Sequence, residues 1–167
     1  PRAGCASVAD RLGSSPVNPS RSVQPEILDE LAPDSPAAVA SRRDLRVINR
    51  LMGGERWIER EVRARSRTGE RVLEIGAGTG ELGGLLSALG AELGGLDLGP
   101  RAADWPGAAT WHQTDVLTFT GWSGYAVVVA NLFLHHFEAE ALGRIGEQVD
   151  RHARLLVVSE PQRSRRS

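Results

Sequence analysis

The chain contains no lysine, so all 20 of its Lys+Arg residues are arginine. Without a lysine amine, the protein has no group for Schiff-base chemistry and no lysine general base. Its single cysteine, Cys5, excludes an internal disulfide framework and a cysteine-based zinc site. No stretch approaches the roughly 18 consecutive apolar residues that a membrane-spanning helix needs. The formal net charge of −1 gives no reason to expect nucleic acid as a partner.

The 167 residues predict one domain, because two domains within this length would each lack a sizeable core. Residues 1–22 show no apolar periodicity, and we expect them to be disordered. They also lack the apolar stretch of a signal peptide, which favours a cytoplasmic protein. The chain begins with Pro1 and its only methionine is Met52, so we expect a fragment or a natural start elsewhere. Residues 23–167 then form the predicted domain.

Within that domain, residues 23–67 predict helices and residues 68–160 predict an α/β core. Ser35-Pro36 is typical of an N-cap followed by a first-turn proline, and Gly53-Gly54 separates the last helix from the preceding one. One face of that last helix is expected to carry Trp57, Ile58 and Val62, with ion pairs Glu59–Arg63 and Glu61–Arg65 on its surface. These helices are interpreted as a lid over a site or as a cover for one face of a sheet.

From Glu70 onward the pattern alternates between strands and helices. The helices are marked by Leu82 to Leu89 and by Leu142 to Val149, whereas residues 100–105 have room for one helical turn. The expected strands are residues 71–75, 92–98, 109–115, 125–131 and 154–159. We therefore predict a doubly wound, Rossmann-like, mostly parallel sheet of about five strands, with helices on both faces.

The strongest motif is Gly76-x-Gly78-x-Gly80, which follows a strand and opens a helix. Its glycines allow a tight turn and a close approach of a ligand, and the helix start favours a negatively charged ligand group. The dinucleotide fingerprint G-x-G-x-x-G would require glycine where this chain has Glu81. Glu74, two residues before the first glycine, suits a cationic group better than a diphosphate. A ligand with an amino acid moiety, a sulfonium and a ribose fits these details.

Three further strand ends carry polar residues. Asp97, 21 residues after Gly76, is placed to accept hydrogen bonds from both ribose hydroxyls. Asp115-Val116 is placed to bind an adenine amino group and to cover the ring, with a helix cap as the alternative role of Asp115. Asn131-Leu132 follows the fourth strand, above the point where ligands bind in open sheets.

With these residues, the sequence resembles the class I S-adenosylmethionine-dependent methyltransferases over about residues 36–160. Asn131–Phe137 is similar to the segment after strand four in small-molecule members, such as those of quinone biosynthesis. The resemblance implies S-adenosylmethionine as cofactor, S-adenosylhomocysteine as product and a small-molecule acceptor, with no nucleic acid or membrane partner. The implied cofactor-binding residues are Glu74, Gly76, Ala77, Gly78, Gly80, Asp97, Leu98, Asp115, Val116 and Asn131.

The chain also departs from the family. The fold normally has seven strands, the last two forming an antiparallel hairpin, whereas only five are recognisable before Ser167. The hypotheses are therefore an enzyme that methylates oxygen, nitrogen or carbon of a small molecule, and a truncated relative that binds cofactor without turnover. An NAD(P)-dependent oxidoreductase is a third hypothesis, opposed by the glycine spacing, by Glu74 and by the lack of a Tyr-x-x-x-Lys pair.

The histidines and tryptophans have competing interpretations. His136, rather than His135, is the candidate catalytic residue as a base or orienting group. The favoured alternative is that one of the two caps the following helix and the other packs. We expect no metal site, since neither histidine has ligand partners at useful spacing. Structural roles are expected for His112 and His152, and also for Trp105, whose other possible role is stacking on adenine.

Overall fold

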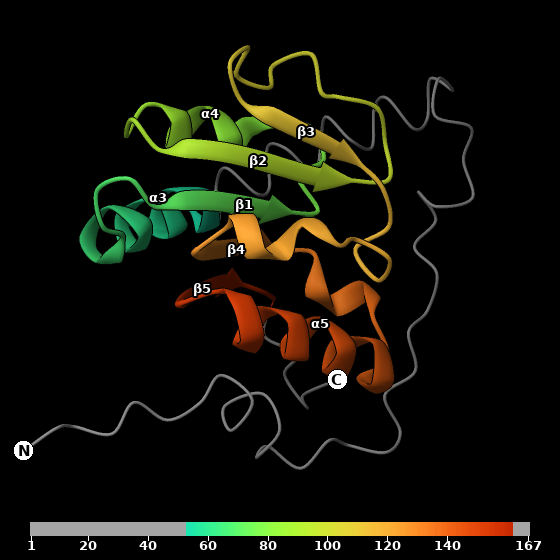
Figure 1. Ribbon diagram of the computed structural model, residues 1–167. Helices are drawn as coiled ribbons and strands as arrows, with labels where there is room; N and C mark the ends of the chain where they lie inside the picture. The colour runs from blue at the N-terminus through green and yellow to red at the C-terminus, as the bar shows by residue number, and fades with distance from the viewer. Residues whose placement is uncertain (1–52, 162–167) are drawn as a thin grey trace, which may run out of the picture.

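The computed structural model describes residues 53–161 and contains one five-stranded sheet (Figure 1). The strands lie in the order β3-β2-β1-β4-β5, and every neighbouring pair is parallel. They comprise β1 (Arg71–Ile75), β2 (Glu92–Asp97), β3 (Thr110–Gln113), β4 (Val127–Asn131) and β5 (Leu155–Ser159). This arrangement confirms the predicted doubly wound, Rossmann-like fold. The expected disorder of residues 1–22 and the expected helices of residues 23–52 lie outside the described residues.

Three helices pack on the two faces of the sheet (Figure 1). Helices α3 (Gly54–Arg65) and α4 (Glu81–Ser87) cover one face, and α5 (Ala139–His152) covers the other. Two short 3₁₀ helices, η2 (Gly121–Gly124) and η3 (Leu134–His136), lie on either side of β4 in the sequence. No helix of the described part is long and apolar enough to cross a membrane.

The alternation of side chains along β1 divides the core into two clusters. Val72 packs with Ile58 of α3 on one face, whereas Leu73 and Ile75 pack with Ile145 of α5 on the other. All of these side chains except Ile145 are 0% exposed. The central strand is therefore buried on both faces, which explains why Val72, Leu73 and Ile75 are all apolar. Glu74 alternates to the same face as Val72, so its carboxylate lies on the side of α3 and α4.

Two local expectations need correction. Trp57 does not share the buried face of α3, because it is 39% exposed while Ile58 and Val62 are 0% exposed. Successive helical residues are about 100° apart, so Trp57 lies beside the stripe formed by the other two. Residues 100–105 form a turn without a helix, in which the Trp105 N–H donates to the Ala102 carbonyl at 3.1 Å. The two predicted ion pairs on α3 are present.

The indole of Trp105 packs inside the cluster formed by α3, α4 and the sheet. It is 4% exposed and meets Trp111 edge-on, with ring centroids 5.2 Å apart. A Cβ added at Gly83 of α4 or at Gly95 of β2 would lie 2.3 Å or 2.7 Å from indole atoms of Trp105. Both glycines therefore provide the space that the indole occupies. This packing confirms the structural interpretation of Trp105 over adenine stacking.

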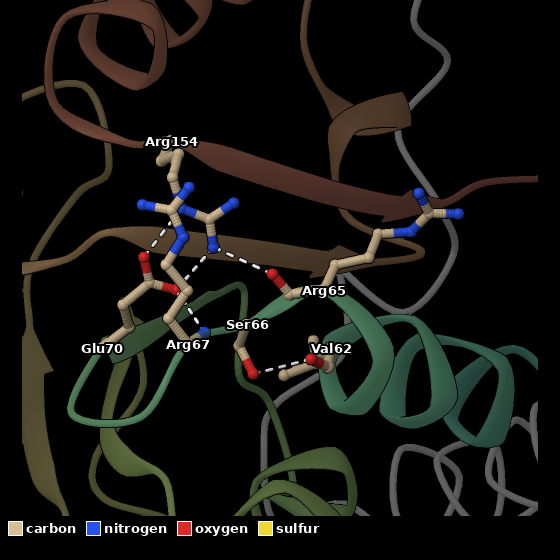
Figure 2. A network of polar contacts seen from close by, with 6 residues as sticks. All are labelled: Val62, Arg65, Ser66, Arg67, Glu70 and Arg154. Atoms are coloured by element: carbon tan, nitrogen blue, oxygen red, sulfur yellow. Dashed lines mark hydrogen bonds and ion pairs between the residues drawn. The ribbon is translucent and has the colours of Figure 1, made fainter.

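The amino ends of β1 and β5 are joined by a polar network (Figure 2). Arg154 donates from Nε and Nη2 to the two carboxylate oxygens of Glu70 at 2.7 and 2.5 Å, and from Nη2 to the Arg65 carbonyl at 3.0 Å. The Arg67 N–H donates to Glu70 at 2.8 Å. The hydroxyl of Ser66 donates to the Val62 carbonyl at 2.7 Å. This network fixes the end of α3 against the starts of two strands.

Candidate functional site

The glycine-rich turn lies at the carboxyl end of β1, beside the point where the strand order reverses between β1 and β4. Gly76, Gly78 and Gly80 all have positive φ, at 68°, 48° and 87°. This backbone conformation is costly for residues with a Cβ, so the three glycines are required by the turn itself. The N–H groups of Gly76 and Ala77 donate to the Leu96 carbonyl of β2 at 2.8 and 3.2 Å. The turn is thus held against the neighbouring strand.

Asp97, the last residue of β2, also binds this turn. Its Oδ2 accepts a hydrogen bond from the Gly78 N–H at 2.9 Å, and its Oδ1 accepts one from the Gly99 N–H at 2.8 Å. Each carboxylate oxygen has a second lone pair, so the group retains acceptor capacity for other donors. Leu98, the next residue, has an unusually exposed apolar side chain at 71%. Asp97 is therefore held against the glycine-rich turn, and an exposed apolar residue follows it in the sequence.

Glu74 is the buried charged residue of this region, with 4% of its surface exposed. Within residues 53–161, its Oε2 atom has no hydrogen-bond partner. Burial raises the pKa of Glu74 well above its ordinary value of 4.5, and the nearby carboxylates of Glu55, Glu81 and Asp97 raise it further. A hydrogen bond involving the Gly83 backbone opposes these effects in part. The charged groups that shift the pKa of Glu74 are therefore all acids.

Asp115 and Val116 lie in the turn that follows β3. Asp115 Oδ1 accepts a hydrogen bond from the Leu117 N–H at 2.8 Å, which corresponds to a local capping turn. Val116 is 5% exposed and packs in the cluster on the α5 face. The structure thus shows a local structural role for each residue, and their predicted contacts with adenine stay predictions.

Asn131 ends β4 next to the start of α3. Its Oδ1 is buried without a hydrogen-bond partner, and a Cβ added at Gly54 would lie 2.9 Å from it. The same added atom would lie 2.7 Å from the Ser159 hydroxyl at the end of β5. The glycine at the start of α3 therefore allows the helix to approach the carboxyl ends of both strands closely.

The segment after β4 turns back over the glycine-rich turn. Leu132 has a φ of 52°, a conformation that is costly for a branched apolar residue. Phe133 follows it and packs directly on Gly76, where an added Cβ would lie 2.1 Å from the Phe133 ring. The turn is less crowded at Gly78, where, among the described residues, an added Cβ would meet the Gly76 carbonyl oxygen alone, at 3.9 Å.

The two adjacent histidines differ in their surroundings. His135 Nδ1 lies 2.8 Å from Glu160 Oε2, and the two side chains are 21% and 23% exposed. His136 is exposed, and its ring lies against that of His135 with centroids 4.1 Å apart. Glu160 is not among the site residues that the sequence motifs predicted. The available signal was its position directly after the fifth strand, at the same edge of the sheet as the other strand-end acids.

The remaining histidines are located away from this edge. His112 Nε2 lies 2.8 Å from the Tyr125 hydroxyl, and the ring packs against Phe119. Burial and the positive charge of Arg71 lower the pKa of His112. His152 lies in the last turn of α5. Among residues 53–161, no group of three or more His, Cys, Asp or Glu residues is arranged to hold a metal ion.

Comparisons with known proteins identify similar solved structures. No family model and no curated protein sequence matches the chain. The sugar N-methyltransferase KedS8 from a Streptoalloteichus species is 25% identical, with a TM-score of 0.54 over 65% of this chain and 48% of that protein. The glycopeptide N-methyltransferase MtfA, complexed with S-adenosyl-L-homocysteine, is 23% identical, with a TM-score of 0.52 over 63% of this chain and 51% of that protein.

The plantazolicin methyltransferase BpumL, in complex with S-adenosylhomocysteine, gives a TM-score of 0.51 at 23% identity. The match covers 72% of this chain and 50% of that protein. This chain therefore spans about half the length of the structures that it matches. The five-stranded parallel sheet of the described residues agrees with the fold of these proteins. Residues 53–161 have the fold of the class I S-adenosylmethionine-dependent methyltransferases, the family whose motifs the sequence resembles.

Proposed function

We propose that this chain binds S-adenosylmethionine and transfers its methyl group to a small-molecule acceptor, releasing S-adenosylhomocysteine. The observation that carries the proposal is the arrangement of Asp97, Gly78 and Glu74. The carboxylate of Asp97 is hydrogen-bonded to the glycine-rich turn, and β1 carries the buried carboxyl of Glu74, whose Oε2 has no hydrogen-bond partner among the described residues. Two of the similar structures contain S-adenosylhomocysteine, which supports this choice of ligand.

The charge of the site favours a cationic ligand. Glu74 is surrounded by the negative charges of Glu55, Glu81 and Asp97. A ligand ammonium or sulfonium group near these carboxylates would stabilise the ionised form of Glu74, whereas a diphosphate would add negative charge to an acidic region. The acidic surroundings of Glu74 therefore favour S-adenosylmethionine over a nicotinamide dinucleotide. Glu74 and the amide of Asn131 are the side chains proposed to face the amino acid part of the cofactor.

The other end of the cofactor has a corresponding set of residues. The remaining lone pairs of the Asp97 carboxylate suit the two ribose hydroxyls. The exposed side chain of Leu98 suits the face of an adenine ring. Asp115 and Val116 are proposed to contact the amino edge and the other side of the ring. Ala77 and the glycines of the turn contribute backbone only.

Methyl transfer from a sulfonium is a direct displacement on an already activated carbon. The protein therefore has to align the acceptor with the methyl group, exclude water and, for an O–H or N–H acceptor, accept a proton. The proposal covers N-, O- and C-methylation. The predominance of acids over arginines in residues 68–150 disfavours a nucleic acid backbone as the acceptor. A cytoplasmic location remains a prediction from the sequence.

A thermal unfolding scan with S-adenosylhomocysteine tests the cofactor, with NADH as the control ligand. A ligand that binds only the folded protein stabilises it by about 2.7 kcal/mol at 100 times its Kd. We expect a higher midpoint with S-adenosylhomocysteine and no change with NADH. Asp97→Asn should reduce this shift, whereas Asp104→Asn, in an exposed turn, should not. A shift with NADH alone, or with neither ligand, would contradict the proposal.

Turnover is tested separately, by measuring S-adenosylhomocysteine release in the presence of phenolic and amine acceptors. A methyltransferase should release product only when an acceptor is present. The alternative is a chain that binds the cofactor without transferring the methyl group, because this chain spans about half the length of the three similar structures. That result would favour the non-catalytic relative and would leave the cofactor assignment intact.

A further inference from the structure

The side chain of Tyr125 reaches across the sheet to β3. Tyr125 lies between η2 and β4, and two strands separate β4 from β3 in the order β3-β2-β1-β4 (Figure 1). The tyrosine oxygen lies 2.8 Å from Nε2 of His112 in β3. On β2, a Cβ added at Gly94 would lie 2.2 Å from this oxygen. The missing side chain on β2 therefore allows a residue beside β4 to bond a residue of β3.

A third residue fixes the direction of this hydrogen bond. Arg71, the first residue of β1, donates from Nη2 to the Tyr125 oxygen at 3.4 Å. A guanidinium only donates, so the tyrosine oxygen accepts this bond and its own proton needs a different acceptor. Tyr125 is 3% exposed, and among the described residues Nε2 of His112 is the atom that accepts this proton. The neutral ring of His112 therefore carries its proton on Nδ1.

Protonation of His112 is incompatible with this arrangement. An imidazolium has two N–H donors and no acceptor, so its Nε2 can only donate to the Tyr125 oxygen. That oxygen would then receive hydrogen bonds from two cations, His112 and Arg71. The buried phenolic proton would also lose its acceptor, which costs more than the net value of an ordinary hydrogen bond. Acid therefore breaks the bond between Tyr125 and His112.

The described groups around His112 do not offset its positive charge. The charged neighbour on β1 is Arg71, and Glu92 of β2 is a loose partner of that arginine, at 3.6 Å and with 74% of its side chain exposed. The ring of Phe119 packs on the imidazole with centroids 4.9 Å apart, and neither η2 nor the rest of β3 contains a charged residue. Burial and the charge of Arg71 both lower the pKa of His112.

The bond matters for β3 because this strand is short. It has four residues, both end residues are exposed, and within the described sheet it pairs with β2 alone. Tyr125 adds a direct polar contact between β3 and the segment before β4. Asp115 and Val116, the proposed adenine contacts, follow in the turn directly after β3. Loosening of β3 would therefore also loosen this turn.

We propose that Tyr125 and His112 form an acid-sensitive latch, which holds β3 while His112 is neutral and releases it when His112 takes up a proton. The folded protein binds this proton less readily than the unfolded chain, whose histidines titrate near pH 6.5. Stability should therefore decrease as pH falls from about 6.5 to the lower pKa of the folded state. Weaker cofactor binding at acid pH is the functional consequence, and this part of the inference rests on the proposed function.

The direction of the bond is tested by NMR of protein labelled with ¹⁵N in its four histidines. Above the titration of His112, we expect a protonated Nδ1 and an unprotonated Nε2, and His112→Gln assigns the signals. Tyr125→Phe removes the hydroxyl of the chain's single tyrosine, so it should abolish this preference and raise the pKa of His112. His152→Gln, in the last turn of α5, should change neither. A wild-type His112 with its proton on Nε2 would overturn the proposal, even if Tyr125→Phe does not fold.

The loosening of β3 is tested by amide hydrogen exchange, expressed as protection factors one pH unit above and one below the titration of His112. In the wild-type protein, the protection of β3 should fall about two- to tenfold relative to that of β4, the effect of losing one hydrogen bond. Tyr125→Phe should show the lower protection at both pH values. Equal wild-type protection of β3 at both pH values would overturn the proposal.

The functional consequence is tested by titration with S-adenosylhomocysteine at the same two pH values. The wild-type protein should lose more affinity at the lower pH than Tyr125→Phe, because the variant retains the titration of the acids around the site and lacks only the latch. The same loss in both proteins would overturn the link between the latch and the cofactor site. A wild-type protein that binds no S-adenosylhomocysteine at the higher pH would contradict the proposed function, whereas the tautomer and exchange measurements would still decide the latch.

Discussion

Two glutamates that are four residues apart in the sequence have opposite environments at the two ends of β1. Glu70, before the strand, is bound by both side-chain nitrogens of Arg154 that face it. The hydrogen bond from Arg154, assisted by Arg67, lowers the pKa of Glu70 to about 2. Glu74, within the strand at its other end, is buried among acids, and its pKa is raised. At the amino end of β1 the carboxylate is therefore paired with an arginine, whereas near the carboxyl end the buried carboxyl is surrounded by other acids.

This difference separates structural polar groups from candidate binding groups. At the amino end, a charged group is paired within the chain and holds α3, β1 and β5 together (Figure 2). At the carboxyl end, Glu74 and Asn131 each have a buried oxygen without a hydrogen-bond partner. Buried polar atoms are normally satisfied, so these two atoms support the proposed ligand contacts of Glu74 and Asn131.

The largest expected loss of stability is that of Gly76→Ala, at the carboxyl end of β1. Gly76→Ala would place a side chain at positive φ and 2.1 Å from the Phe133 ring. The left-handed conformation costs roughly 1–2 kcal/mol and the overpacking roughly 1–3 kcal/mol, so we expect about 2–5 kcal/mol of destabilisation. Urea unfolding measures this loss, and the response to S-adenosylhomocysteine should also weaken.

Gly69→Ala is the matched control at the amino end. Gly69 has a φ of 82°, but nothing lies within 4 Å of an added Cβ. Its substitution should therefore cost only about 1–2 kcal/mol and should leave the ligand response unchanged. Equal losses for the two variants would show that Phe133 moves freely and that the two ends are not sterically different.

A smaller effect, of opposite sign, is expected for Glu74→Gln. Because the folded-state pKa of Glu74 is raised above 4.5, the folded protein retains a proton that the unfolded chain releases above that pH. Wild-type stability should therefore decrease as pH rises from 4.5 through the raised pKa, and the variant should lack this decrease. At pH 8 we expect Glu74→Gln to be more stable by roughly 0.5–2 kcal/mol.

The same variant should bind S-adenosylhomocysteine about tenfold more weakly, since it removes a charged partner worth about 1.4 kcal/mol or more. Unfolding at several pH values and ligand titration provide the two measurements. A variant that is less stable than wild type at pH 8, with unchanged ligand affinity, would assign Glu74 a structural role like that of Glu70.

A smaller effect is expected for Glu70→Gln. The pKa of Glu70 is lowered to about 2, so its contribution is complete above pH 4.5 and is lost as pH falls through about 2. We expect the variant to be about 1 kcal/mol less stable at pH 7, and the difference from wild type to shrink below pH 4.5. Ligand affinity should not change. Glu92→Gln removes a looser pair, 3.6 Å from Arg71, and should have a smaller effect.

The predictable features are those that depend on neighbours in the sequence. A nearly continuous apolar run predicted β4, because a strand buried on both faces has apolar residues at successive positions, and a short apolar segment ending in glycines predicted β1. The spacing of Gly76, Gly78 and Gly80 predicted a turn, and all three have positive φ. The spacing also placed Asp97 at the strand end beside this turn, where the structure shows its bond to Gly78.

Other features required contacts between distant segments. Trp105 is buried because Gly83 and Gly95, on different elements, leave space for its indole. The distinction between His135 and His136 depends on Glu160, which contacts His135 from the end of another strand. Helical periodicity alone placed Trp57 on the buried face of α3, whereas the position of the helix on the sheet leaves it partly exposed.

The sequence by itself determined the class of fold, the location of the glycine-rich turn and the identity of the acids around it, because strand burial and turn conformation are set by local residue types. The tertiary structure alone decided which charges at the two ends of β1 are paired. Glu70 directly precedes β1 and Glu74 lies within it, four residues further on, yet the ion pair of Arg154 is with Glu70. The physical reason is that a carboxylate's charge state depends on burial and on neighbours brought together by the sheet, and neither can be read from adjacent residues.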